Sequence, residues 1–185
     1  MGDSIEADKE HIKQIVRKMS EVDGEGKPLI DLVLVVVDTS SKDISVCYDV
    51  INNTLIPCLG KENSHHILVG LNQYDMAMKG RHWDRDNNAP DPVLAYFLEL
   101  KATSVKKRIY EATGVIIDPV CYCAGYIDGE EQQRPYNLAK LLYYILISVP
   151  SEKRLVLADK LNVNATNWTN NDADYAGVVQ KSFWE

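Results

Sequence analysis

Residues 65–75 of this chain read HHILVGLNQYD, and the fold is best inferred from this stretch outward. It begins as an apolar run of strand length in which apolar and polar residues do not alternate. Such a run is typical of a strand buried on both faces, as in a parallel sheet covered by helices. Ligands of these sheets bind outside the carboxyl ends of the strands. Asn72 and Asp75, which close the stretch, are therefore predicted to lie at a ligand site.

Asp75 has the chemistry needed to recognise a guanine base. A carboxylate can accept two parallel hydrogen bonds from a planar N–H edge, and guanine presents such an edge at N1 and N2. Asn72 is expected to tie the loop to its neighbours. The alternative is an ordinary polar turn after a strand, because Asn and Asp both favour turns.

Two more strands, with helices between them, are predicted from the apolar patterns. One strand is LIDLVLVVV at 29–37, and the other, at 115–121, contains Pro119, which suits an edge or a strand start. Strands separated by helices of this length require right-handed crossovers and form a parallel sheet. The prediction is an α/β fold, a three-layer parallel sheet with helices on both faces, with helices at 4–22, 45–59, 92–113 and 135–149.

The ends of the helix at 92–113 are predicted most sharply. Asp91 and Pro92 suit an N-cap and a first helical residue, and Gly114 suits a C-terminal stop. Phe97 of this helix and Val46 of the helix at 45–59 are expected to face the core.

The chain is predicted to consist of one α/β domain and an appendage. Residues 1–150 form the domain in this interpretation, and residues 151–185 form a helical C-terminal extension. Within the extension, helices are expected at 151–161 and 172–183, on either side of the Asn- and Thr-rich segment 162–171. At 185 residues the chain is long enough for one domain with a real core.

Composition and charge narrow the possible partners. The net charge of −7 argues against nucleic acid, whose binding needs a basic surface. No apolar run approaches the roughly 20 residues of a membrane-spanning helix, and the acidic N-terminus lacks the pattern of a signal peptide. A cytoplasmic location is therefore expected. The four cysteines fit reduced thiols, and a zinc site with His65 and His66 is disfavoured for lack of a second close ligand pair.

Three predicted strand ends carry short polar or small residues: 38–40, 72–75 and 121–125. With these motifs, residues 1–150 resemble the C-terminal part of an Era-like GTPase domain, a member of the Ras-like P-loop group. The segment 72–75 (NQYD) is similar to the guanine-specificity motif Asn-Lys-x-Asp, with Gln73 in place of lysine. The segment 123–125 (CAG) is similar to the motif Ser-Ala-x, in which the alanine N–H binds guanine O6. The resemblance implies binding of GTP or GDP, through Asn72, Gln73, Asp75, Cys123 and Ala124.

The chain departs from this family in its phosphate-binding elements. No Gly-x-x-x-x-Gly-Lys-Ser/Thr loop occurs in the 185 residues, and GEGKP at 24–28 has the spacing of a turn instead. The chain thus resembles a G domain truncated before the phosphate loop. No catalytic or metal-binding residue is assigned, so GTP hydrolysis is not expected from the chain alone. Nucleotide binding is expected to be weak, with Mg²⁺ involved only if the missing segment is supplied.

The resemblance also has a consequence for partners. Without the family's other strands, the strand at 29–37 is expected to expose an edge, and exposed edges pair with other chains. A homodimer or a protein partner is therefore expected there. The alternative to a nucleotide-binding protein is a non-catalytic interaction module, or a GTPase remnant, that binds no nucleotide.

Overall fold

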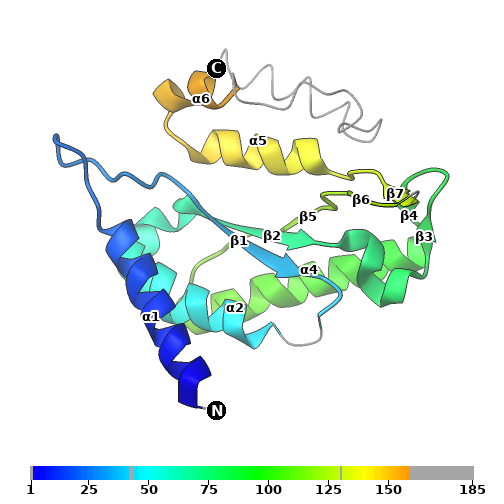
Figure 1. Ribbon diagram of the computed structural model, residues 1–185, viewed down its shortest axis with the longest axis horizontal. Coiled ribbons are helices and arrows are strands. Elements are labelled where there is room, and N and C mark those ends of the chain that lie inside the picture. Colours follow the sequence, from blue (N-terminus) through cyan, green and yellow to red (C-terminus); the bar gives the residue numbers. More distant parts are fainter. Residues whose placement is uncertain (1, 42–43, 130, 159–185) are drawn as a thin grey trace.

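The computed structural model describes residues 2–41, 44–129 and 131–158, and its centre is a small parallel sheet (Figure 1). The strands are β1 (Val33–Asp38), β2 (Ile67–Asn72) and β5 (Val120–Cys121), in the order β1-β2-β5. The predicted α/β class and the three parallel strands are confirmed. Within the described residues, β1 forms one edge of the sheet.

The register of the sheet brings the strand ends together. Val33 pairs with Ile67, and the pairing continues to Asp38 opposite Asn72. Leu71 pairs with Cys121 on the other side of β2. The first five residues of β2 are all buried, as expected for a central strand covered on both faces. The loops after all three strands therefore start at one end of the sheet.

Helices cover both faces of this sheet. One face carries α1 (Gly2–Met19) and α4 (Pro92–Thr113). The same face carries a continuous helical segment that consists of α2 (Ser45–Val50), the π-helix η1 (Ile51–Leu55) and α3 (Ile56–Leu59). Figure 1 shows α5 (Leu138–Ser148) on the opposite face, with α6 (Ser151–Ala158) beyond it. Two apolar clusters correspond to these faces. The first is built on Val69, Leu71, Ile51, Leu55 and Ile109, and the second on Leu68, Val120, Tyr122 and Leu141.

The predicted ends of α4 are confirmed. The Asp91 carboxylate accepts hydrogen bonds from the backbone N–H of Val93 and of Leu94, both at 2.9 Å. Gly114 follows the helix with φ of 73°, a left-handed conformation that favours glycine. Because a cap depends on a few adjacent residues, a local pattern was enough to locate it.

Several predicted boundaries differ from the structure. β1 begins at Val33 and not at 29, and α1 ends at Met19 and not at 22. The third strand is only Val120–Cys121, because pairing with β2 starts at Gly70 and Pro119 has no N–H to donate. Residues 115–118 nevertheless alternate between buried and exposed, with Ile116 outside.

Two predicted core positions are wrong. Val46 is 70% exposed and Phe97 is 39% exposed. Helix α2, which carries Val46, has no buried residue, and the buried face of α4 is formed by Leu94, Leu98, Val105 and Ile109 and not by Phe97.

The short elements around the strand ends were not predicted. They include two hairpins, β3 (Trp83–Asp84) with β4 (Ala89–Pro90) and β6 (Tyr126–Asp128) with β7 (Glu131–Gln133). Two 3₁₀ segments, η2 (Lys61–His66) and η3 (Tyr74–Gly80), flank β2. Of the extension, α6 confirms part of the predicted helix at 151–161, whereas the helix predicted at 172–183 lies outside the described residues. None of the helices in the described ranges is long and apolar enough to cross a membrane.

Candidate functional site

The loop after β2 and the loop after β5 are held together by side chains of the predicted site. Asn72 Oδ1 accepts a hydrogen bond from the backbone N–H of Ala124 at 3.2 Å. The Cys123 thiol donates to Asp75 Oδ1, with 3.0 Å between sulfur and oxygen. The structure thus brings four of the five predicted residues into two direct contacts. Asn72 does tie the loop to a neighbour, as its position suggested.

Asp75 and Cys123 form a buried pair beneath the loop surface. They are 5% and 3% exposed, and the backbone N–H of Gly125 donates back to Cys123 Sγ at 3.4 Å. The pKa of Cys123 is raised to about 12, mainly by burial and secondly by the hydrogen bond that the thiol donates to Asp75. The sulfur is therefore a protonated donor at neutral pH. It donates to one of the two carboxylate oxygens of Asp75, Oδ1.

Gln73 and Ala124 form the exposed rim of the two loops. Gln73 adopts a left-handed backbone, with φ of 57° and ψ of 44°, which directs the chain from β2 into η3. A left-handed conformation is uncommon for a residue other than glycine and is often found at functional positions. Gln73 therefore turns the chain beside the Asn72–Ala124 contact.

The loop after β1 supports the site through Thr39, which sequence reasoning did not select. Thr39 is buried, and its backbone N–H donates to Asn72 O at 2.9 Å. Its hydroxyl lies against the carbonyl oxygens of Asn72 and Gln73, at 2.6 Å from the latter. The Asp38 carboxylate, at the end of β1, accepts a hydrogen bond from the backbone N–H of Ser40 at 2.7 Å. The position of Thr39 at a strand end was the only signal in the sequence.

Aromatic residues brace the same end of the sheet. Tyr74 stacks on Tyr136 with ring centres 5.8 Å apart, and Trp83 meets the same ring edge-on at 5.3 Å. The Tyr136 backbone pairs with Cys123 through two hydrogen bonds, of 2.9 and 3.0 Å. Trp83 therefore anchors its loop, and the site loops rest on a packed support.

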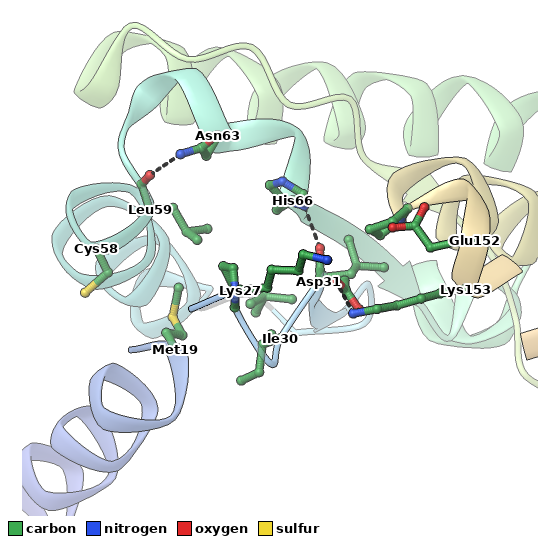
Figure 2. A pocket seen from close by; sticks show the side chains of 14 residues that line it. Met19, Lys27, Ile30, Asp31, Cys58, Leu59, Asn63, His66, Glu152 and Lys153 are labelled. Atoms are coloured by element: carbon green, nitrogen blue, oxygen red, sulfur yellow. Dashed lines mark hydrogen bonds and ion pairs between the residues drawn. The ribbon is translucent and has the colours of Figure 1, made fainter. Parts of the chain in front are cut away.

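A separate cavity of about 420 Å³ lies at the opposite end of the strands (Figure 2). Its wall includes Val33, the first residue of β1, and His66, the residue before β2. Lys153 contacts both oxygens of Asp31, at 2.8 and 2.6 Å, and the His66 ring lies 2.6 Å from the Asp31 carbonyl oxygen. The ion pair of Lys153 with Asp31 links α6 to the segment before β1, and the His66 ring links that segment to the start of β2. The charges of Asp31 and Lys153 are therefore already paired with each other.

Neither a metal site among the described residues nor a related protein identifies the function of these loops. Within residues 2–41, 44–129 and 131–158, no group of three His, Cys, Asp or Glu side chains is placed to hold a metal ion. Comparisons with known protein families, with curated proteins and with solved structures found no match. The site is therefore interpreted from its own geometry.

The four cysteines are expected to differ sharply in reactivity. Cys58 is exposed, whereas Cys123 is buried and protonated. Iodoacetamide at about pH 8 should therefore modify Cys58 first and leave Cys123 intact, since the thiolate is the reactive form. Timed quenching and peptide mass spectrometry measure both rates. Modification of Cys123 as fast as Cys58 would contradict the buried contact with Asp75.

Proposed function

We propose that this chain is a guanine-nucleotide-binding protein of the Era-like GTPase group, which binds the base of GTP or GDP at the two strand-end loops. The observation that carries this proposal is the pairing of the loops, Asn72 with Ala124 and Asp75 with Cys123. It supports the resemblance of NQYD and CAG to the family's two base-recognition motifs, which lie 52 residues apart between Asn72 and Ala124.

Asp75 supplies the specificity in this proposal. A carboxylate has about four lone-pair positions, and the Cys123 thiol occupies one of them. The remaining positions accept guanine N1–H and N2–H after the loop surface opens by a small side-chain movement. Adenine presents no such pair of donors, so the site selects guanine.

Ala124 and Gln73 complete the proposed base site. The Ala124 N–H, which donates to Asn72 Oδ1, is shared with guanine O6 in a three-centre hydrogen bond. The exposed Gln73 lies against the base in the place where the family has lysine. Its shorter amide side chain covers the ring less completely.

The affinity in this proposal rests on the base alone. Contacts between cations and phosphate oxygens are the strongest hydrogen bonds of such sites, and the chain has no Gly-x-x-x-x-Gly-Lys-Ser/Thr loop to make them. We therefore propose weak nucleotide binding without hydrolysis by this chain on its own. Mg²⁺ enters only where another segment provides a phosphate loop.

A non-catalytic interaction module is the second candidate function. The observation that favours it is the position of β1, whose outer edge is unpaired among the described strands and whose Val36 is half exposed. An edge of this kind can add a strand from a second copy or from a protein partner. The two candidates differ in whether the strand-end loops bind nucleotide.

Calorimetric titration with guanosine, GDP, GTP and ATP tests the first candidate. We expect saturable binding of the three guanine compounds with similar affinities, and no binding of ATP, because only the base is recognised. Asp75→Asn is the matched variant, since it keeps the shape but offers one acceptor and one donor. It should lose GDP and gain xanthosine diphosphate, whose C2 oxygen accepts the new N–H.

Asp75→Ala is the control for this change of specificity. It should bind neither GDP nor xanthosine diphosphate, and its unfolding transition should match that of Asp75→Asn. Equal binding of ATP and GTP would show that the base is not recognised by Asp75. Absence of heat with every nucleotide would refute the first candidate and favour the interaction module.

A further inference from the structure

A second cavity, of about 740 Å³, lies between the loop after β1, the end of η3 with the residues after it, and α4. Its lining includes Thr39, Ser40 and Ser41 on one side and Met78, Lys79, Arg81 and His82 on another. Asn72, Asp75 and Ala124 are not part of it, so this is a site distinct from the proposed base site. Its volume is in the range of pockets that hold small organic molecules.

The charge of this cavity is positive. Lys79, Arg81, Lys101 and Arg108 line it, and the described lining residues include neither Asp nor Glu. No ion pair found among the described residues involves any of these four cations. We call the space the basic cavity. In a chain with a net charge of −7, four cations gathered around one cavity favour an anionic ligand.

Two of the cations also have structural roles inside the basic cavity. Lys101 Nζ donates to the carbonyl oxygens of Thr39 and Ser41, at 3.0 Å from the latter. The Arg108 guanidinium lies over the Tyr48 ring, 5.4 Å from its centre. Asp38 acts electrostatically on Lys101 from beside the cavity, and the nearby His82 ring contacts Asp91 at 2.8 Å. Lys79 and Arg81 are exposed at the rim, which leaves their charges available to a ligand.

The walls between these cations are apolar. Phe97 and Leu100 of α4 line the basic cavity while remaining 39% and 51% exposed. Ile44, Tyr48 and Met78 line it as well. An inorganic anion would leave this surface in water, whereas a ligand with an aromatic body would cover it.

The rim segment has an unusual backbone. Met78, Lys79 and His82 have φ of 55°, 62° and 67°, although none of them is glycine. Left-handed conformations are strained for residues other than glycine and collect at ligand-binding loops. Here they hold the segment that carries Lys79 and Arg81 at the mouth of the basic cavity.

We propose that the basic cavity binds a small phosphate monoester with an aromatic body. Lys79 and Arg81 bind the phosphate, for which arginine provides a planar pair of donors, and Phe97, Leu100 and Tyr48 contact the ring. The net charge of −7 disfavours a polyanion such as nucleic acid. This site does not depend on guanine binding at the strand-end loops.

Phenyl phosphate is the probe that tests this inference, titrated into the ¹⁵N-labelled chain at low salt and followed by backbone amide shifts. We expect saturable shifts in the residues around the basic cavity. Inorganic phosphate and phenol, the two halves of the probe, should each bind at least about tenfold more weakly, since each retains one kind of contact.

The variant Lys79→Gln/Arg81→Gln should weaken binding of phenyl phosphate by about tenfold or more, because it removes the two rim charges. Lys13→Gln/Lys107→Gln is the matched control, as it lowers the net charge equally at exposed residues outside the lining. Asp75→Asn should bind the probe as the unaltered chain does, which separates this site from the proposed base site.

Four outcomes would overturn the inference. Absence of saturable binding would remove the site itself. Equal weakening in both double variants would show attraction to net charge and not to Lys79 and Arg81. Equal affinities for phenol and phenyl phosphate would show an apolar pocket without anion recognition, while equal affinities for inorganic phosphate and phenyl phosphate would remove the role of the aromatic body.

Discussion

Leu71→Ala is expected to lower the free energy of unfolding by about 2–5 kcal/mol. Leu71 is fully buried in the central strand β2, within the cluster that joins the sheet to α4 and the helical segment after β1. Truncation to alanine removes buried apolar surface and leaves a cavity that packed neighbours cannot fill. The hydrogen bond from Tyr122 N to the Leu71 carbonyl, at 2.9 Å, belongs to the backbone and survives the change. The loss therefore measures packing.

Val36→Ala is the matched control for this measurement. Val36 lies in the neighbouring strand β1 but is 50% exposed. Its truncation should cost about 1 kcal/mol or less, which is the range of strand propensity. Urea denaturation followed by circular dichroism gives both values. If Leu71→Ala were no more destabilising than Val36→Ala, the central position of β2 would be wrong.

Gly125→Ala is expected to have the second largest effect. Gly125 has φ of 77°, and a Cβ there would lie 2.7 Å from the Gln133 carbonyl oxygen and 3.0 Å from Pro135 N. The left-handed conformation alone costs alanine about 1–2 kcal/mol. Because both clashing atoms belong to the backbone, the loop itself must also move. We therefore expect the free energy of unfolding to fall by more than that cost. Guanine binding should also weaken, because the movement of the loop displaces the neighbouring Ala124.

Gly129→Ala separates these two contributions, since Gly129 has φ of 59° and a Cβ there would have no neighbouring atom of the described residues within 4 Å. The free energy of unfolding of Gly129→Ala should fall only by the cost of the left-handed conformation, and its affinity for guanine should be unchanged. Thermal unfolding and calorimetry on both variants provide the comparison. Equal losses in the two variants would mean that the contact of Gly125 with residues 133–135 is not close.

The buried contact between Cys123 and Asp75 explains how alkaline pH should act on the site. The pKa of Cys123 lies above the ordinary value of 9.0 because burial and Asp75 favour the thiol. A group with a raised pKa contributes stability that is present below its unfolded value and is lost as the pH rises toward about 12. The contribution of the Cys123 thiol to the pairing is therefore present at neutral pH and lost in strongly alkaline solution.

The sequence by itself determined the parts of this protein that depend on neighbouring residues. The apolar run before Asn72 indicated a buried central strand, and Asp91 and Gly114 marked the ends of α4. Parallel strands place their carboxyl ends together, so the motifs at 72–75 and 123–125 were expected to meet. Guanine binding at these motifs stays a proposal, because the meeting of two loops does not require a ligand.

Only the tertiary structure decided which atoms meet. No local pattern links Cys123 to Asp75, or Lys101 to Thr39 and Ser41, because these partners are about 50 to 60 residues apart and adjoin only after the sheet and α4 have packed. The basic cavity has the same origin, since its cations come from the end of η3, from the residue after it and from α4. Burial and long-range hydrogen bonds belong to the packed chain and not to any window of its sequence.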